Sequence, residues 1–243
     1  MSLGRSDRFL PVAWLARRTT TPALLALVTV GWFVAILAVG VLCGDLLRGA
    51  ERPDGSTSFD SSITTWMVAH RTGGLTTLAR LLSAVGSQKI LIPLAGVSAV
   101  LLVARRRLVL AGLVIVAWGG ALGLYNLVKH FVHRPRPPMA IWLVKVTSTS
   151  FPSGHATQSL ATFVALALVA AALAASAGVV AKSLALTLAA GIGWSRVYLG
   201  VHWTTDVIAG WLIGATWVMI VVWEARIASV IERRRGDEGR VHR

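Results

Sequence analysis

Residues 195–206 contain the side chains best suited to chemistry in this sequence of 243 residues. His202 stands four residues before Asp206, a spacing that places both side chains on one face of a helix. A carboxylate there can accept the Nδ1 proton of the imidazole and leave Nε2 free as a nucleophile or base. Ionisable residues in an apolar segment are costly and favour a functional explanation. The pair alone is equally typical of a satisfied buried polar contact.

A second candidate group is the run Pro152-Ser153-Gly154-His155, which has the features of a helix start. Ser153 can cap the helix, and Gly154 allows close approach of the backbone. The free N–H groups and the positive end of the helix dipole then form an anion site. His155 adds a second imidazole, so one histidine can attack phosphorus while the other protonates the leaving oxygen.

Three cations accompany these groups: Lys129, Arg136 and Arg196. A phosphate monoester dianion would leave them with a net charge of about +1, enough to stabilise developing oxyanion charge without a metal. Lys129 or Arg136 alone is more typical of a helix-end charge at the membrane surface. His130 and His133 are close enough to suggest metal ligands, but no carboxylate or cysteine lies nearby. We therefore expect no metal and no cofactor.

The composition indicates an integral membrane protein. The chain is 55% hydrophobic and 14% charged, with a mean hydropathy of +0.70, whereas soluble domains carry about 25% charged residues. The net charge of +14 does not indicate nucleic-acid binding, because its charges flank the apolar runs. The single cysteine, Cys43, excludes an intramolecular disulfide and a cysteine-based metal site.

Six apolar runs predict an all-α bundle of six transmembrane helices, at about residues 22–43, 78–103, 108–131, 153–175, 179–198 and 204–223. The first run is longer than the core of a signal peptide, so we interpret it as a span. Lys89, inside the second run, faces either a polar cavity or the surface. Asp60 is a predicted N-cap for a short helix that is either interfacial or a connector packed on the bundle.

The spans form one predicted domain, residues 22–228, between a basic segment, 1–21, and a basic tail, 229–243. With a cytoplasmic N-terminus, fourteen of the 24 Lys and Arg residues fall on the cytoplasmic side. Five others remain as ordinary outer-loop charges, Arg134 among them. We therefore expect a multi-pass plasma-membrane protein with both termini in the cytoplasm. This topology brings the three candidate groups, at residues 129–136, 152–155 and 195–206, to the extracytoplasmic face.

Together these groups resemble the three-part signature of the type 2 phosphatidic acid phosphatase family. The match consists of Lys129 with Arg136-Pro137, then Pro152-Ser153-Gly154-His155, then Ser195-Arg196 with His202 and Asp206. Residues 60–86 resemble the upstream region of the family more loosely. The resemblance covers residues 129–206 most specifically. It implies the core fold shared with bacterial acid phosphatases and vanadium haloperoxidases.

The resemblance also implies a role for each site residue. His202 would form a phosphohistidine and Asp206 would orient it, while His155 would act first as general acid and then as base. The phosphate oxygens would be held by Lys129, Arg136, Ser153, Gly154 and Arg196. Substrates of the class include undecaprenyl diphosphate, phosphatidylglycerophosphate and phosphatidic acid.

Two alternatives to lipid-phosphate hydrolysis stay open. A phosphotransferase would pass the phosphoryl group from His202 to an acceptor other than water. A non-catalytic lipid-phosphate binding or transport protein would use the same anion site. Every reading names a lipid phosphate or diphosphate and the surrounding membrane lipids as partners, and none includes nucleic acid. The sequence does not indicate the oligomeric state.

Overall fold

The computed structural model describes residues 22–50 and 52–241, with side chains described for residues 25–50 and 52–227. The predicted basic segment 1–21 lies outside this part. The described chain contains helices and no strand: α2 (Pro22–Gly49), α3 (Ser58–Ala69), α4 (Gly73–Val85), α5 (Gln88–Ala104), α6 (Leu108–Phe131), α7 (Gly154–Leu173), α8 (Gly178–Tyr198), α9 (Thr204–Val241), and the short 3-10 turns η1 (Met139–Ile141) and η2 (Ala175–Ala177).

The predicted all-α membrane bundle is confirmed. Five described helices, α2, α6, α7, α8 and α9, are long and apolar enough to cross a bilayer, and α4 with α5 makes a sixth when the bent pair is counted as one span. Apolar runs of this length form helices because lipid offers no partner for an unpaired backbone N–H or C=O group. α9 begins at Thr204, as predicted, but continues as helical backbone through the predicted tail to Val241.

The span predicted at residues 78–103 is broken in the structure and is not one straight helix. The chain forms α4 and α5, which meet at an angle of 43°. Gly86 ends α4, and Ser87 is in an extended conformation at the start of α5. A Cβ atom on Gly86 would lie 2.4 Å from Cγ2 of Ile192 on α8. Close packing against α8 therefore restricts this position to glycine, and hydropathy alone does not register the break.

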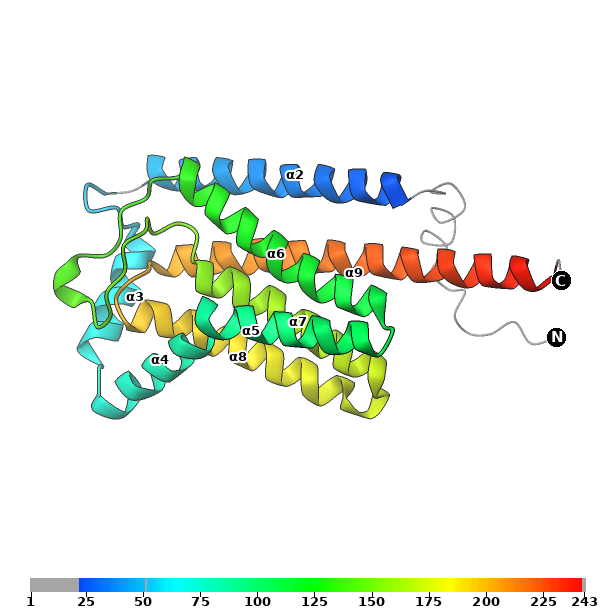
Figure 1. Cartoon of the computed structure of the whole chain (residues 1–243). Coiled ribbons are helices and arrows are strands. Elements are labelled where there is room, and N and C mark those ends of the chain that lie inside the picture. The colour runs from blue at the N-terminus through cyan, green and yellow to red at the C-terminus, as the bar shows by residue number, and fades with distance from the viewer. Residues whose placement is uncertain (1–21, 51, 242–243) are drawn as a thin grey trace.

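The long helices run side by side, with α7 packed against α6, α8 and α9 (Figure 1). α7 is the most buried span, whereas α2 packs on α6 and α9 at the edge of the bundle. The helix that starts at the second candidate group thus occupies the centre of the fold. Figure 1 also shows that α2 begins and α9 ends at one end of the bundle, opposite α3 and α4.

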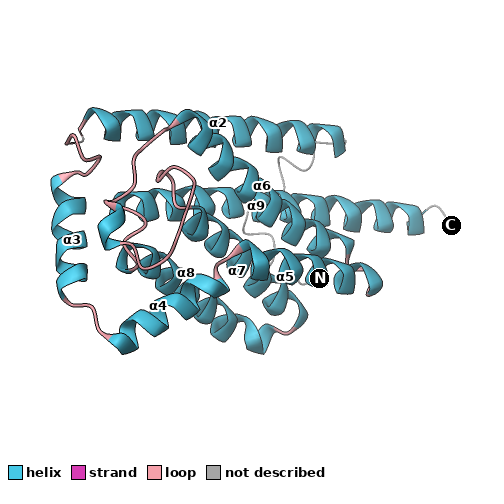
Figure 2. Cartoon of the chain, turned by 60° about the vertical axis from the view of Figure 1, so that its left-hand side comes forward, coloured by secondary structure: helices cyan, strands magenta, loops and turns pink. Residues whose placement is uncertain are grey.

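α3 lies across the ends of the spans (Figure 2). Its N-cap is Thr57, not Asp60 as predicted, because the Thr57 hydroxyl accepts the backbone N–H of Asp60 in a capping box. Asp60 is instead fully buried. Ile63 and Met67 pack against the bundle, so the connector interpretation holds for that face. Trp66, beside this face, is exposed.

Candidate active site

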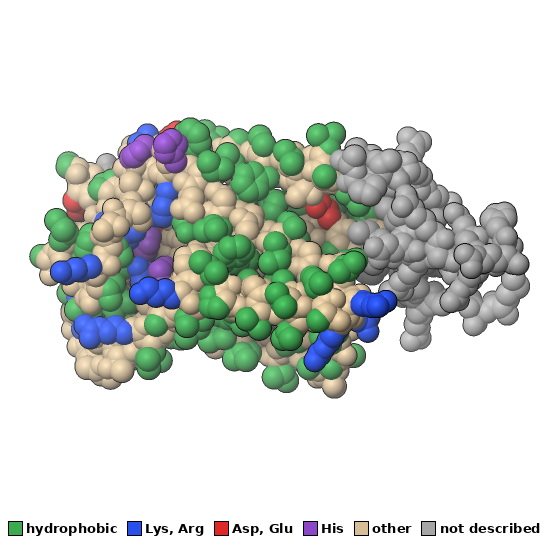
Figure 3. Space-filling view, in the orientation of Figure 1, with side chains coloured by type: hydrophobic (Ala, Val, Ile, Leu, Met, Phe, Trp, Pro, Cys, Tyr) green, Lys and Arg blue, Asp and Glu red, His purple; other side chains and the backbone are tan. Residues whose placement is uncertain are grey.

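A hollow at the α3 and α4 end of the bundle brings basic and histidine side chains together (Figure 3). The cavity has a volume of about 260 Å³. Typical sites for drug-sized ligands measure roughly 300–1,000 Å³, so this cavity suits a headgroup and not a hydrocarbon chain. It is lined by Gly86, Gln88, Tyr125, Lys129, Arg136, Val146, Thr147, Ser148, Gly154, His155, Arg196 and His202.

Backbone carbonyls of the loop between α6 and α7 accept hydrogen bonds from two of the three predicted cations. Lys129, at the end of α6, donates to the backbone carbonyls of Thr149 and Ser150. Arg136 donates from Nε to the Ser148 carbonyl at 2.6 Å and from Nη2 to the Thr149 carbonyl at 3.1 Å. Burial lowers the pKa of Arg136 to about 10, so it remains protonated at neutral pH.

Arg196 closes the cavity from α8 and is almost fully buried. Its Nη1 donates to the hydroxyl of Ser83 on α4, while its Nε is buried without a partner among the described residues. Ser83, which the sequence did not single out, therefore positions Arg196. A buried guanidinium N–H without an acceptor is costly and fits an anionic ligand.

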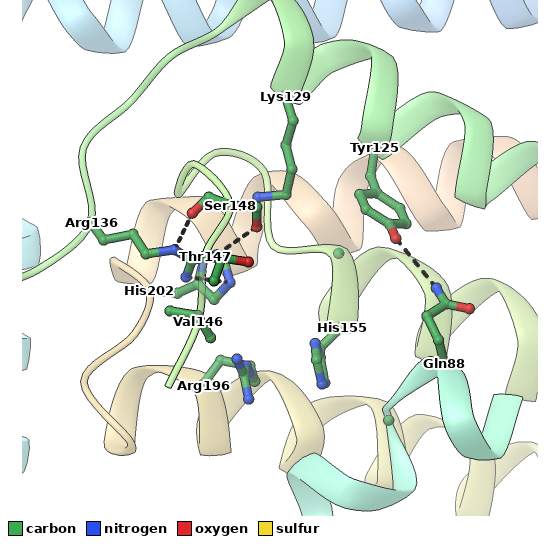
Figure 4. A pocket seen from close by; sticks show the side chains of 12 residues that line it. Gln88, Tyr125, Lys129, Arg136, Val146, Thr147, Ser148, His155, Arg196 and His202 are labelled. Carbon is green, nitrogen blue, oxygen red and sulfur yellow. Dashed lines mark hydrogen bonds between the residues drawn. The ribbon is translucent and has the colours of Figure 1, made fainter. Parts of the chain in front are cut away.

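Contacts at both ring nitrogens of His202 indicate which of them carries the proton. Its Nε2 lies 3.1 Å from Nη1 of Arg136 (Figure 4), and its Nδ1 lies 3.4 Å from Oδ2 of Asp206. A guanidinium only donates, so Nε2 must accept and the ring proton must be on Nδ1. Burial lowers the pKa of His202 well below 6.5, and the positive charge of Arg136 lowers it further. The neutral ring thus presents a lone pair at the cavity.

The start of α7 supplies the other imidazole. Ser153 is the N-cap residue, but its side chain makes no capping hydrogen bond, which corrects the prediction that it caps the helix through its hydroxyl. Its Oγ is buried and unpartnered among the described atoms. Gly154 and His155 line the cavity, where the first N–H groups of α7 have no helical acceptor. A Cβ atom on Gly154 would lie 2.8 Å from the Tyr125 ring.

Arg134 is the main residue that sequence reasoning misplaced. It is fully buried, with Nη1 2.7 Å from Asp206 Oδ1 and Nη2 2.9 Å from Asp60 Oδ2, and is not an ordinary outer-loop charge. Burial lowers the pKa of Arg134, but the two carboxylates outweigh this effect and raise it. A buried Asp206 requires a compensating cation, and this requirement could have identified Arg134 from the sequence.

Asp60 links α3 to the start of α9. Its carboxylate accepts the backbone N–H of Thr205 at 2.9 Å and the Thr205 hydroxyl at 2.8 Å, so it caps the helix that carries Asp206. Burial raises the pKa of Asp60, yet the hydrogen bonds from Thr205 and Arg134 lower it below its usual value. Asp60, Arg134 and Asp206 form one buried chain of charges behind His202.

The structure gathers all eight predicted site residues in one place. Six of them line the cavity: Lys129, Arg136, Gly154, His155, Arg196 and His202. The other two, Ser153 and Asp206, are fully buried behind it. They contact each other, because the Ser153 backbone N–H donates to the Asp206 carbonyl at 3.0 Å. The arrangement combines a cationic anion site, an unprotonated ring nitrogen and a second histidine, which are the groups needed for transfer of a phosphoryl group.

Comparison with known proteins agrees with this class of site. Residues 107–227 match the family model described as the PAP2 superfamily. The matched segment contains all eight predicted site residues. The chain belongs to the PAP2 superfamily.

Two curated relatives are similar to this chain. Undecaprenyl-diphosphatase of Sulfolobus acidocaldarius is 32% identical over 142 residues, which cover 56% of this chain and 64% of the relative. Phosphatidylglycerophosphatase B of Bacillus subtilis is 33% identical over 108 residues, which cover 42% of this chain and 51% of the relative. Each match thus spans less than two thirds of the relative's own length.

Two solved structures share the fold. A transmembrane PAP2-type phosphatidylglycerolphosphate phosphatase from Bacillus subtilis superposes with a TM-score of 0.67 at 26% identity, covering 76% of this chain and 93% of that one. LpxE of Aquifex aeolicus gives a TM-score of 0.56 at 24% identity, covering 69% of this chain and 96% of that one. The protein is therefore a multi-pass helical membrane protein of this architecture.

Proposed function

We propose that this protein hydrolyses a membrane lipid phosphate or diphosphate through a phosphohistidine at His202. The observation that carries the proposal is the unprotonated Nε2 of His202, which faces the cavity beside the Arg136 guanidinium at 3.1 Å. Lys129 and Arg196 complete a positive wall, so the phosphoryl oxygens are neutralised by side chains and no metal is required.

In the first half-reaction, His202 Nε2 attacks phosphorus and forms the N–P bond as the P–O bond to the leaving group breaks. The electron pair of that bond goes to the leaving oxygen, and His155 supplies its proton. Asp206 holds the Nδ1 proton and stabilises the charge that develops on the ring. In the second half-reaction, His155 takes a proton from water, whose oxygen attacks phosphorus. The N–P electrons return to His202 and release phosphate.

The cavity size and the surrounding helices favour a lipid substrate. A space of about 260 Å³ accommodates the phosphate headgroup, while the apolar surfaces of the spans suit its hydrocarbon chain. The relatives' substrates make a polyprenyl diphosphate and phosphatidylglycerophosphate the first to test. From the distribution of Lys and Arg we also propose a plasma-membrane location, cytoplasmic termini and an extracytoplasmic site.

Phosphate release from a panel of lipids tests this function. Purified full-length protein in detergent is incubated with a polyprenyl diphosphate, phosphatidylglycerophosphate and phosphatidic acid, with and without EDTA. We expect release from at least one lipid that survives EDTA and falls by roughly 10²–10⁴-fold or more in His202→Ala. A wild-type protein that releases no phosphate from any of them, or an unaffected variant, would refute the proposal.

A further inference from the structure

A chain of uncharged polar side chains lies beside the phosphate cavity and has no role in the two half-reactions. Gln158 is fully buried inside the span α7, where an amide is costly unless it is hydrogen-bonded. It contacts Gln88, at the start of α5, and Gln88 in turn contacts Tyr125 on α6. Gln88 and Tyr125 line the cavity.

The buried contact of Gln158 determines which group donates in each hydrogen bond of this polar network. Gln158 Nε2 donates to the Trp118 carbonyl at 3.0 Å, so its Oε1 must face Gln88. Gln88 must therefore present its amide N–H₂, which donates to Gln158 Oε1 and to the Tyr125 hydroxyl oxygen at 3.3 Å. An amide group has two N–H donors, and both are now used.

The Tyr125 hydroxyl is consequently an acceptor toward Gln88 and keeps its own proton for another partner. Across residues 25–50 and 52–227, the Tyr125 hydroxyl accepts from Gln88 and donates to no protein acceptor. The Tyr125 ring is held against the start of α7, where a Cβ atom on Gly154 would be 2.8 Å from Cε2. A rigid ring thus presents an unused O–H donor at the cavity wall.

Tyr125 stands on the side of the cavity where the leaving group must lie. In Figure 4, His155 lies between Arg136 and His202 on one side and Tyr125 and Gln88 on the other. The attacking and leaving atoms are roughly in line in phosphoryl transfer. Attack by His202 therefore directs the leaving oxygen toward His155, and the rest of the leaving group extends toward Tyr125.

A donor at this position matches a leaving group that is itself a phosphate. An alcohol leaving group offers the single ester oxygen, which His155 protonates. A leaving phosphate carries additional anionic oxygens, and hydrogen bonds to charged acceptors are roughly twice as strong as neutral ones. Resting on the proposed phosphatase function, we propose that the Tyr125 hydroxyl binds the leaving phosphate of a lipid diphosphate and makes the site selective for diphosphates.

The test measures binding of two water-soluble probes to the full-length protein in detergent by calorimetry. Inorganic phosphate occupies the phosphoryl site alone, whereas methylenediphosphonate, which has no hydrolysable P–O–P bridge, extends to the leaving-group side. We expect wild-type protein to bind the diphosphonate at least about tenfold more tightly than phosphate. Tyr125→Phe should reduce that ratio by roughly tenfold and leave phosphate affinity within about twofold.

Tyr198→Phe is the matched control, since it removes the other tyrosine hydroxyl of the chain, which bonds Thr72 outside the cavity. It should retain the wild-type ratio. Retained phosphate binding by Tyr125→Phe also shows that this variant is folded. The inference is overturned if wild type does not prefer the diphosphonate, or if Tyr125→Phe weakens both probes equally or neither. Intact selectivity without phosphate release from any lipid would refute the proposed function instead.

Discussion

At the scale of single residues, hydrogen bonds to Asp206 determine how the site is held. Asp206 accepts hydrogen bonds from Arg134, Ser150 and the backbone N–H of Trp203, in addition to facing Nδ1 of His202. These donors hold the Asp206 carboxylate in place independently of its contact with the imidazole. The orientation of the nucleophile therefore depends on a network that extends beyond the signature residues.

Replacement of Arg134 by Met should be severely destabilising. The change leaves Asp60 and Asp206 buried without their cation, and breaking a buried pair in this way costs about 3–5 kcal/mol. Thermal unfolding in detergent measures the loss. Arg80→Met is the control, because Arg80 is exposed and bonds only the Leu143 carbonyl among the described contacts. Equal unfolding temperatures for the two variants would contradict the buried network.

His202 should remain neutral in moderately acidic solution. Burial and then the charge of Arg136 lower its pKa well below 6.5. The unfolded chain binds the extra proton first, so this residue's contribution to stability is complete above about pH 6.5 and declines below it. We expect the imidazole NMR signal that is absent from His202→Ala to titrate with a midpoint well below 6.5. A titration midpoint at or above 6.5 would contradict this environment.

The sequence predicted the His202–Asp206 contact because four residues along one helix is a local relation. Arg134 and Asp60 are 74 positions apart, and no periodicity within either segment specifies that they meet. The same holds for the Ser83 hydroxyl and Arg196, which are 113 positions apart. Residue types and spacing thus identified the groups that line the cavity, while the groups that hold them depend on tertiary packing.

At the scale of elements, the break between α4 and α5 shapes one wall of the cavity. Both Gly86 and Gln88 line it, and Ser83 reaches Arg196 from the last turn of α4. A straight helix through this region would not end at the cavity wall. Apolar composition predicted the span correctly, but close packing between Gly86 and Ile192 decides where it bends.

Gly86→Ala should reduce phosphate release because its Cβ would lie 2.4 Å from Ile192 Cγ2. Overpacking of this kind costs about 1–3 kcal/mol. We expect α4 to move away from Ile192 to relieve the contact, which would displace the cavity wall. Ile192→Leu removes the β-branch at the contact, so the double variant should recover most of the lost kcat/KM. Gly112→Ala, whose Cβ would meet nothing within 4 Å, is the control. A double variant no better than Gly86→Ala would show that this contact does not set the break.

At the scale of the whole molecule, the start of α2 lies at the end of the bundle opposite α3 and α4 (Figure 1), and the cavity lies at the α3 and α4 end (Figure 3). Hydropathy predicted the spans well because lipid imposes the same demand on every backbone group that it surrounds. The side of the membrane that each end faces stays a prediction, in which the Lys and Arg distribution favours cytoplasmic termini.

Membrane-impermeant maleimide labelling of intact cells should locate the cavity end outside. Cys43 is the sole cysteine, so a Cys43→Ala background allows single exposed cysteines to be introduced. Lys145→Cys lies in the loop beside the cavity, and Ser176→Cys lies in η2 at the opposite end. We expect labelling of the former in intact cells and of the latter only after lysis. The reverse pattern would overturn the topology.

The most direct measurement of the central claim is to trap the phosphoryl group on the enzyme. Rapid quenching with a phosphorus-labelled lipid substrate is followed by cleavage after arginine and mass spectrometry. Cleavage at Arg196 and Arg226 yields a peptide, residues 197–226, that contains His202 as its only histidine and excludes His155. We expect acid-labile phosphate on this peptide in wild type and none in His202→Ala. Steady turnover with the label on another peptide, or with no labelled enzyme, would contradict it.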